Sequence, residues 1–396
     1  MCSVSSTCVL CTCVDCLLLS SALPTTRLAE KLVAEPSLLT TAVDRDLIRH
    51  YCRTSRRNSH TTLTGESEIA AAHTAHSTSQ TQHTAHSRTA AEMAKPKVLV
   101  FLGTSRQGSA VVDALLASDK FEVYATTRSA KSAEALKARG VKCGPFIAGD
   151  AASAKAALDA AAPSLVFFTT LMGSREVEGA SGKIIVDAIK AKGGVQHVVY
   201  SSVANADVAP DSVGHFKSKL DVEGHLKASG LNYSILRPVA FFENYDDPAN
   251  FNALKKGSVK GLWQADLKVK HVACRDIGKA AAVMLANPSK WQGKTLDCAS
   301  DDLTGTDVAA ALTEVSGVEC TYGVAVPRFV MQCFMKDLNA MIEFFETTGY
   351  DSDIAAFKAV VPDAQDCKAW FAAKGAWANG EKFGAEEASS SWFGLF

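Results

Sequence analysis

The sequence predicts an α/β fold in which a doubly wound parallel sheet is followed by a smaller, mainly helical C-terminal lobe. Two observations carry this prediction. From Lys97 onward, short apolar runs alternate with amphipathic runs of helical period, and the first apolar run ends at a turn that contains glycine. Strands that alternate with helices need right-handed crossovers, which produce a parallel sheet with helices on both faces.

Six strands are expected before residue 239, because each of these runs is short, apolar and rich in β-branched or aromatic side chains. The strands are expected at 98–102, 121–127, 142–149, 164–170, 196–202 and 232–238. The segments between them place apolar side chains at helical spacing, which predicts helices. These helices are expected at 109–118, 130–140, 153–162, 180–193 and 216–230.

Beyond Pro238 the alternation becomes irregular. Helices are expected at 276–288 and 306–317, and the run at 294–300 is expected to return to the sheet. The run at 328–350 is aromatic and Met-rich at helical spacing, which indicates core packing. The wall of an apolar substrate pocket is the alternative for that run.

We expect a sheet lobe at 93–245, a C-terminal lobe at 246–375 and a loose tail at 376–396. Residues 1–92 are expected to be a disordered or non-native leader. Much of this segment is rich in Ser, Thr, His and Ala, and cannot bury enough apolar surface to offset its ordering entropy. Met93 comes shortly before the first strand, so either it is the true start or the residues before it are dispensable.

Two alternatives for the leader are an organelle transit peptide and a zinc site on its closely spaced cysteines, Cys8, Cys11, Cys13 and Cys16. Their spacing is tighter than that of the common structural zinc sites, so no metal is expected. The six cysteines after residue 93 are scattered and form no Cys-x-x-Cys pair, which is typical of a reducing compartment. A cytoplasmic location is expected, with organelle targeting by the leader as the alternative.

Composition argues against two classes of partner. No stretch reaches the roughly 18 uninterrupted apolar residues that a membrane-spanning helix requires. The net charge of -1 gives no sign of a nucleic-acid or membrane-surface partner. Apolar residues make up 47% of the chain, which is enough for a substantial core.

The turn after the first strand has the features of a dinucleotide-binding turn. In such folds the pyrophosphate lies against a helix N-terminus, and glycines permit a tight turn and close packing of helix on strand. The turn keeps two glycines and has four polar residues between them. Its cofactor-binding candidates are Gly103, Thr104, Ser105, Arg106, Gln107 and Gly108.

The end of the second strand indicates NADP(H) rather than NAD(H). An NAD site places a carboxylate there to hold the ribose 2′-hydroxyl, whereas an arginine accommodates a 2′-phosphate. This chain has Arg128 at that point and no carboxylate until Glu134. A solvated surface arginine is the alternative. At the end of the third strand, Asp150 is a candidate for contact with an adenine amino group.

From about residue 97 to about residue 372 the chain resembles the NmrA-like proteins, an atypical branch of the short-chain dehydrogenase/reductase superfamily. The resemblance rests on Gln107-Gly108, Thr127-Arg128 and Gly149-Asp150. Its most specific stretch, residues 215–244, reads HFKSKLDVEGHLKASGLNYSILRPVAFFEN. Two C-terminal runs, at 273–281 and 302–317, also match. The resemblance implies a Rossmann-like fold that binds NADP(H).

The family's turn usually reads GATGxQG, so Leu102 and Ser105 stand where the first two glycines belong. Ser105 is small enough to fit. Leu102 fits if the strand runs one residue further and Gly103 makes the turn. These departures imply weaker cofactor binding, and a protein that has lost the cofactor is a further alternative.

The resemblance also implies the reactive groups. Ordinary members of the superfamily use Tyr-x-x-x-Lys on a helix, with a serine at the end of the preceding strand, and i, i+4 spacing puts Tyr and Lys on one helical face. Here His215 replaces the tyrosine and Lys219 keeps the lysine, while Ser202 ends the fifth strand. We expect Lys219 and Pro238 to bind cofactor, with His215 either a substitute acid or a bystander.

Histidine in place of tyrosine is usual among the nucleotide-sensing members of the family, which favours a dinucleotide sensor that regulates a protein partner. The alternative is an NADPH-dependent reductase of quinones or other apolar carbonyl compounds, with His215 as proton donor. Whether the chain is an enzyme is left open, because function lies in the site rather than in the fold.

Overall fold

A computed structural model describes residues 95–246 and 258–373 of this chain. The leader expected at 1–92, with its clustered cysteines, and the tail expected at 376–396 lie outside the described residues. Within the described ranges, no helix has the length and apolar character needed to cross a membrane.

A central sheet carries the fold. Within the described residues its seven strands run parallel, in the order β10-β6-β5-β4-β1-β2-β3. The strands are β1 (Lys97–Val100), β2 (Glu122–Thr127), β3 (Lys142–Pro145), β4 (Leu165–Thr169), β5 (His197–Ser201), β6 (Tyr233–Pro238) and β10 (Thr295–Cys298). The predicted doubly wound parallel sheet is therefore confirmed, and the run expected at 294–300 joins it as β10, beside β6.

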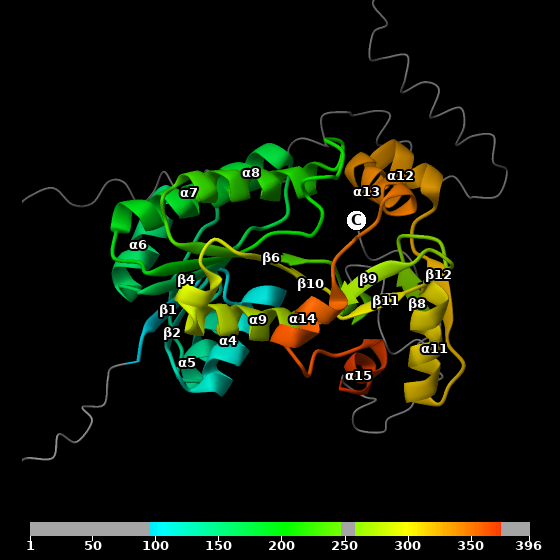
Figure 1. Ribbon diagram of the computed structural model, residues 1–396, viewed down its shortest axis with the longest axis horizontal. Coiled ribbons are helices and arrows are strands. Elements are labelled where there is room, and N and C mark those ends of the chain that lie inside the picture. Colours follow the sequence, from blue (N-terminus) through cyan, green and yellow to red (C-terminus); the bar gives the residue numbers. More distant parts are fainter. Residues whose placement is uncertain (1–94, 247–257, 374–396) are drawn as a thin grey trace, which may run out of the picture. The chain divides into compact units, whose positions relative to one another are not determined.

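Helices cover both faces of the sheet, as the alternation of the sequence predicts (Figure 1). One face carries α6 (Ala151–Ala161), α7 (Arg175–Lys192) and α8 (Gly214–Ala228). The other carries α4 (Arg106–Ser118), α5 (Ala130–Ala138) and α9 (Cys274–Ala286). Each layer buries an apolar cluster against the sheet, so the strands are covered on both sides.

Helix α9 comes late in the chain but packs against α4, the first helix after β1. A Cβ on Gly278 of α9 would lie 2.3 Å from the carbonyl oxygen of Ala110 in α4. The two backbones therefore touch, and only glycine fits at this crossing. The contact ties the later part of the chain to the helix that follows the first turn.

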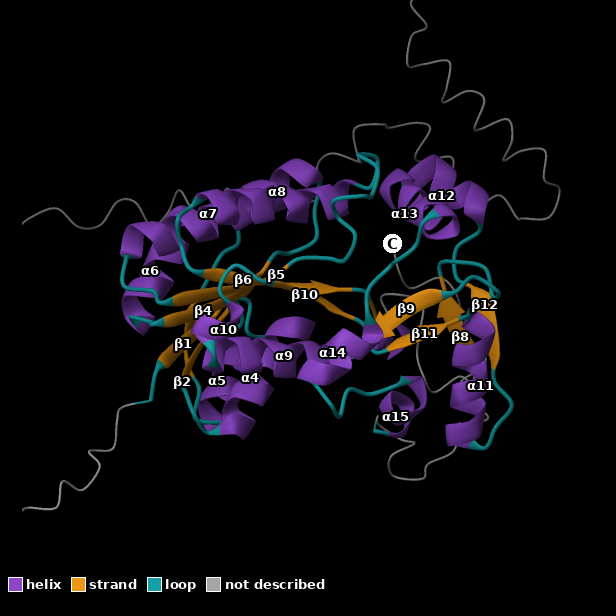
Figure 2. Cartoon of the chain, viewed as in Figure 1, coloured by secondary structure: helices purple, strands orange, loops and turns teal. Residues whose placement is uncertain are grey.

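Most of the remaining elements form the C-terminal lobe (Figure 2), but α10 packs against β6 and α9, and α14 packs against β10. Two small sheets have the orders β11-β9-β7 and β12-β8. The strands are β7 (Ala240–Phe241), β8 (Ser258–Gly261), β9 (Val269–Val272), β11 (Asp301–Leu303) and β12 (Thr321–Val324). The helices are η2 (Phe242–Asp246), α10 (Pro288–Trp291), α11 (Gly305–Ser316), α12 (Arg328–Phe334), α13 (Lys336–Thr347), α14 (Ile354–Val360) and α15 (Cys367–Ala372).

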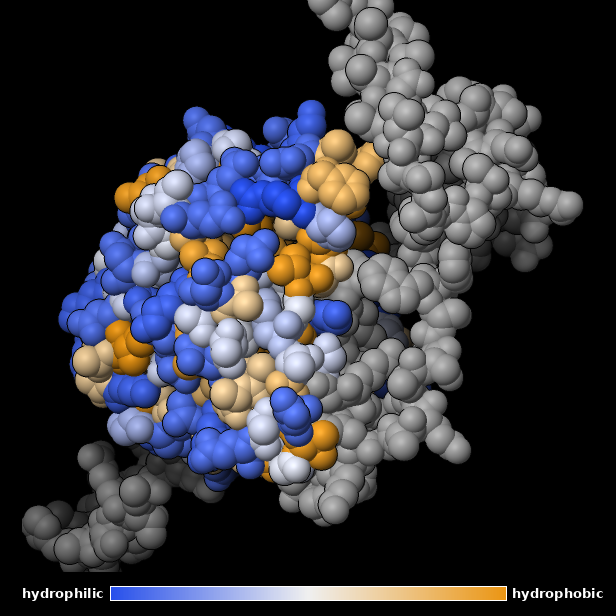
Figure 3. Space-filling view, turned by 90° about the vertical axis from the view of Figure 1, so that its right-hand side faces the viewer, coloured by the Kyte–Doolittle hydropathy of each residue, from blue (hydrophilic) through white to orange (hydrophobic). Residues whose placement is uncertain are grey.

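The aromatic run at 328–350 forms two helices, α12 and α13, rather than one. Most of the apolar side chains of α13 enter a core cluster that also holds Phe216 of α8. On α12, Phe329 and Phe334 are instead 63% and 73% exposed. Figure 3 shows apolar side chains at the upper edge of the face on which α12 lies. The run is thus core over α13 and leaves large apolar side chains exposed on α12.

Candidate functional site

The candidate residues gather where the parallel strands end. The strand order reverses between β1 and β4, since the chain proceeds from β1 to β2 and β3 in one direction and from β4 to β5 and β6 in the other. In open α/β sheets ligands bind in the crevice beyond the carboxyl ends of the strands at this reversal. The loops at 101–105 and 170–174 border it.

The turn after β1 is made by Leu102 itself, so the arrangement in which it would fit without strain, with a longer strand and Gly103 in the turn, is not the one observed. Strand β1 ends at Val100, and Leu102 has a φ of 54°, in the left-handed region. Such a backbone costs a non-glycine residue about 1–2 kcal/mol. The Leu102 side chain lies in the apolar cluster beneath α6, α7 and α8, and its N–H donates to Thr126 Oγ1 at 2.9 Å. Burial and this hydrogen bond offset the strain.

The two glycines of the turn stand where no side chain fits. A Cβ on Gly103 would lie 2.6 Å from the Cβ of Ala125, and one on Gly108 would lie 2.1 Å from the carbonyl oxygen of Leu102. Ser105 has an ordinary extended backbone and caps α4, its Oγ accepting the Gly108 N–H at 3.1 Å. Of the two glycines that the family's turn has and this chain lacks, only the one at Leu102 imposes strain.

Backbone donors are available at this turn. The N–H groups of Thr104 and Gln107 donate to no group in the described residues. The first turn of α4 has no acidic side chain, so the partial positive charge of its N-terminus is not neutralised locally. These features suit an anion such as a pyrophosphate.

The polar side chains of the turn hold neighbouring elements. Arg106 donates from Nη1 to Asn244 Oδ1 in η2 at 2.8 Å. Gln107 Oε1 accepts the Ser201 hydroxyl at 2.5 Å, which ties α4 to the end of β5. Thr104 is exposed, and its hydroxyl lies 3.3 Å from that of Thr127.

Arg128 lies exposed just after β2, and its guanidinium bonds no group within the parts of the chain that the structure describes. The next residue, Ser129, caps α5, its Oγ accepting the Ser132 N–H at 3.3 Å. An unpaired guanidinium beside a helix N-terminus is a favourable place for a phosphate. Asp150 is exposed and caps α6, its carboxylate accepting the Ser153 N–H at 3.0 Å. Its contact with adenine stays a prediction.

His215 begins helix α8 and is paired with Asp337 of α13, in the C-terminal lobe. Its Nδ1 is hydrogen-bonded to Asp337 Oδ2, and its backbone N–H donates to Oδ1 at 3.4 Å. Burial raises the pKa of Asp337, but the hydrogen bond and charge of His215 outweigh it and hold that pKa below its usual value. Nε2 bonds no group in the described residues and is not fully enclosed. The pairing therefore fixes the ring and leaves Nε2 for another molecule.

Lys219 lies one turn after His215 on the same helix and is paired with Glu178 of α7. Its Nζ donates to Glu178 Oε1 at 2.6 Å and to the His215 carbonyl oxygen at 3.1 Å. The Lys219 side chain is 14% exposed and that of Glu178 is fully buried. The expected i, i+4 pair on one helical face is therefore present, and it is supported by two carboxylates from other elements.

The serines and the proline of the prediction lie at strand ends but are enclosed. Ser202 follows β5 directly and is 2% exposed, and Ser201 is fully buried. Pro238 ends β6, is buried, and its carbonyl oxygen accepts the Ala204 N–H at 3.0 Å. Contact of Ser202 with substrate and of Pro238 with cofactor stay predictions.

Glu178 and Asp337 were not among the predicted site residues. Glu178 is 41 residues from Lys219 along the chain, and Asp337 is 122 residues from His215. An acidic residue in the first turn of a helix is usually solvated, and both have that position. The local sequence does not distinguish Glu178 from its neighbour either, because Glu176 and Glu178 both flank Val177 in the first turn of α7, yet only Glu178 is buried.

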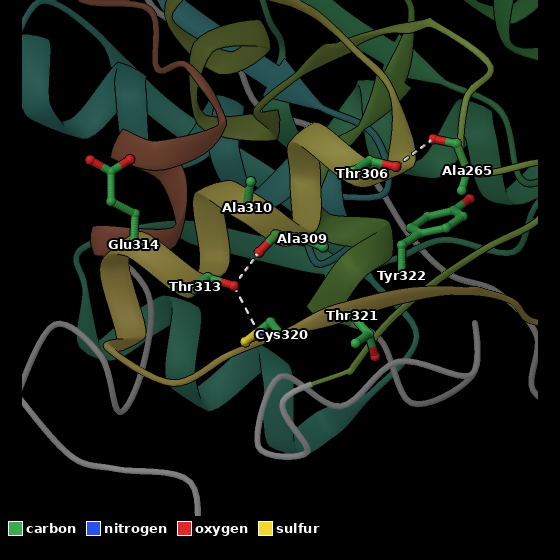
Figure 4. A pocket seen from close by; sticks show the side chains of 9 residues that line it. All are labelled: Ala265, Thr306, Ala309, Ala310, Thr313, Glu314, Cys320, Thr321 and Tyr322. Carbon is green, nitrogen blue, oxygen red and sulfur yellow. Dashed lines mark hydrogen bonds between the residues drawn. The ribbon is translucent and has the colours of Figure 1, made fainter.

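A separate pocket of about 600 Å³ lies in the C-terminal lobe, between α11 and β12 (Figure 4). The hydroxyls of Thr306, Thr313 and Tyr322 already have partners. Thr306 Oγ1 donates to the Ala265 carbonyl at 3.2 Å, and Thr313 Oγ1 accepts the Cys320 N–H at 2.9 Å. None of the predicted site residues lines it, so the candidate site is the edge of the large sheet.

Two solved structures share this arrangement of sheet and helices. The NADPH-dependent quinone oxidoreductase QOR2 of Escherichia coli, complexed with NADPH, has a TM-score of 0.56 and 23% identity, covering 69% of this chain and 98% of that one. The negative transcriptional regulator NmrA in complex with NAD has a TM-score of 0.56 and 18% identity, covering 70% of this chain and 94% of that one. At these identities the likeness shows the fold alone.

The sequence itself gives the family. An NmrA-like family domain-containing oxidoreductase of Aspergillus campestris is 26% identical over 292 residues, which cover 64% of this chain and 84% of that protein. The sequence model of the NmrA-like family matches residues 94–367. This match spans both lobes, from the residues before β1 to the start of α15. The chain belongs to the NmrA-like family.

Proposed function

We propose that this protein binds NADP(H) and reduces apolar carbonyl compounds of the quinone type, with His215 as the proton donor. The observation that carries the proposal is the His215–Asp337 pair, which holds the imidazole by Nδ1 and leaves Nε2 without a partner in the described residues. The reductase was the alternative expectation from sequence. The pairing favours it, because it holds the ring of a residue that is only 8% exposed in one orientation, while Nε2 keeps no partner in the described residues.

Several features support binding of the cofactor. The turn after β1 offers backbone N–H groups at a helix N-terminus, and Arg128 offers an unpaired guanidinium after β2. Lys219, one turn after His215 on α8, offers a further N–H donor. Solved structures of the same fold carry NADPH in one case and NAD in another. When bound, NADPH would supply a hydride to the substrate.

The chain's own residues would supply the proton and the apolar surroundings. Protonated His215 would donate from Nε2 to the carbonyl oxygen, so that hydride and proton together convert a quinone to a hydroquinone. After this step the neutral imidazole would take a new proton from solvent, and Asp337 would stabilise the protonated ring. Loops at the carboxyl edge of the sheet expose Met172 (75%), Val208 (59%) and Leu171 (38%), which suit an apolar substrate.

Replacing His215 with glutamine is expected to lower kcat for quinone reduction by about 10²-fold or more, because a positioned acid contributes about that much. The affinity for NADPH should change by no more than about twofold, since Lys219 and Arg128 remain. Stopped-flow oxidation of NADPH with a panel of quinones measures the first, and calorimetric titration the second.

The matched control is His225→Gln. His225 lies on the same helix and is likewise paired with a carboxylate, Asp187, at 2.7 Å, but near the helix C-terminus. It should keep full activity. Unchanged turnover in His215→Gln across the panel would remove the proton-donor role.

Replacing Arg128 with alanine is expected to weaken NADPH binding by about 10- to 100-fold, because a charge-assisted hydrogen bond to phosphate contributes about 1.5–3 kcal/mol. NADH lacks the 2′-phosphate, so its affinity should be unchanged. Calorimetric titration with each nucleotide measures both. Arg139→Ala is the control, because Arg139 follows α5 and is paired with Asp113 instead. Equal losses for NADPH and NADH would contradict the selectivity for NADP(H).

A dinucleotide sensor is the second candidate. The bond from Arg106 in the turn to Asn244 in η2 favours it, because it connects the proposed phosphate site with the C-terminal lobe. Occupancy would then change the surface that α12 presents to a protein partner. Hydrogen exchange with and without NADPH tests this, and identical protection of α12 and η2 in both states would exclude it.

A further inference from the structure

We infer that Glu178 is a positioning residue for the nicotinamide half of the dinucleotide, because its buried carboxylate holds both Lys219 and the loop that follows β4. The inference rests on the proposed binding of NADP(H), but not on the reduction of any substrate. Nothing in the sequence pattern of the site assigned a role to Glu178.

The carboxylate of Glu178 is enclosed and has three donors. Oε1 accepts from Lys219 Nζ and from the Thr170 hydroxyl, each at 2.6 Å, and Oε2 accepts the Gly173 N–H at 3.4 Å. A carboxylate is costly to bury unless it is paired and hydrogen-bonded. Here both conditions are met, by groups from two different elements. Helices α7 and α8, which carry the pair, lie side by side on the sheet (Figure 1).

The pairing determines what Lys219 can bind. Its ammonium has three N–H groups, of which one goes to Glu178 and one to the His215 carbonyl oxygen. The third has no acceptor in the described residues. Because Glu178 neutralises its charge, Lys219 is a directed donor rather than a free cation. That chemistry suits a neutral hydroxyl, such as that of a ribose, whereas Arg128 and the α4 N-terminus suit phosphates.

The same carboxylate fixes the loop at the strand-order reversal. Glu178 binds this loop at Thr170 and at Gly173, and between these points Leu171 and Met172 are exposed. The loop borders the crevice on the side opposite the turn after β1. Glu178 thus fixes both Lys219 and this loop, which border the space for the nicotinamide half. This double role accounts for a buried carboxylate at this position.

The experiment compares Glu178→Gln with Glu176→Gln in the full chain, by calorimetric titration with NADPH and with adenosine 2′,5′-bisphosphate. Glu176 lies in the first turn of the same helix and is exposed, so it controls for loss of a charge there. Glu178→Gln is expected to bind NADPH at least about 10-fold more weakly, because charged hydrogen bonds are lost. Its affinity for the bisphosphate, which lacks the nicotinamide half, should stay within about twofold. Glu176→Gln should match the wild-type protein for both ligands.

A general loss of structure would lower the affinities for both ligands together. A loss of affinity for NADPH but not for the bisphosphate, the split expected here, therefore reports positioning. Lys219→Met should show the same split, and the loss in the double variant should be smaller than the sum of the two single losses, because the two residues share one contact. If Glu178→Gln does not fold, Glu178→Asp keeps the charge but withdraws the carboxylate, and the same split is expected.

Two results would count against the inference. Folded Glu178→Gln or Glu178→Asp that binds NADPH like the wild-type protein would overturn it, and so would equal losses for both ligands. Failure of the wild-type protein to bind NADPH is a different result. It would overturn the proposed function and this inference with it.

Discussion

Replacing Gly108 with alanine is expected to abolish measurable NADPH binding and to destabilise the fold by about 1–3 kcal/mol or more. The added Cβ would lie 2.1 Å from the Leu102 carbonyl oxygen and 3.0 Å from the Gly103 Cα, and both are backbone atoms. Helix α4 must therefore move away from the turn whose N–H groups would meet the pyrophosphate. Thermal unfolding and calorimetric titration measure the two effects.

The control for this substitution is Gly224→Ala, in the exposed part of α8. No atom lies within 4 Å of a Cβ built there, so alanine should raise stability by about 0.5–1 kcal/mol and leave binding unchanged. If Gly108→Ala bound NADPH as tightly as the wild-type protein, the turn after β1 would not be the phosphate site.

Replacing Arg237 with methionine is expected to lower the free energy of unfolding by about 3–5 kcal/mol near neutral pH, because it leaves a buried carboxylate without its main partner. Arg237 of β6 donates to Glu223 of α8 twice, from Nε at 2.9 Å and from Nη2 at 2.8 Å. The Glu223 side chain is fully buried. Lys227, which also contacts it, is 42% exposed and cannot replace the paired hydrogen bonds.

The same substitution should change how stability depends on pH. Burial raises the pKa of Glu223, but the hydrogen bond and charge of Arg237 outweigh it and keep that pKa below its usual value. The pair therefore stabilises the wild-type fold above the unfolded-state pKa, about 4.3, and this contribution is lost as pH falls through the folded-state value. In Arg237→Met the carboxyl can be protonated, so its deficit relative to wild type should shrink from about pH 7.5 to about pH 4.5.

Urea unfolding of both proteins at the two pH values measures this difference. Arg328→Met is the matched control, because Arg328 also makes two hydrogen bonds with one carboxylate, Glu346, but with both side chains partly exposed. It should cost no more than about 1 kcal/mol at either pH. A deficit for Arg237→Met that is small, or that grows in acid, would contradict the account of a buried pair.

Sequence patterns located the sheet well, because its inner strands, such as β1, β4 and β5, are short apolar runs, and buried parallel strands need no alternation. The small strands of the C-terminal lobe were not predicted. Strands such as β7 and β11 have two and three residues, too few to show any period. Helix α4 begins three residues earlier than its apolar pattern, because Ser105 caps it and polar residues fill its first turn.

For the site, the residues that follow strands could be identified from sequence, since parallel strands bring their carboxyl ends to one edge. The turn after β1, Arg128, His215 and Lys219 all lie at that edge or on the helix above it. The carboxylates that support them could not be identified, because Glu178 and Asp337 reach the site from elements distant in the chain. Tertiary packing brings them there, and no local pattern records it.

The left-handed Leu102 has a consequence for how the site binds. A turn of glycines is free to sample many shapes when empty, and binding must then restrict each residue at a cost of about 1–2 kcal/mol. Here the side chain of Leu102 is anchored in the core, so we expect the turn to keep one shape with and without a dinucleotide. The free-energy cost of fixing the backbone of the turn is therefore part of folding, and binding does not have to supply it. The replacement of a glycine by Leu102 thus preorganises the turn for ligand binding.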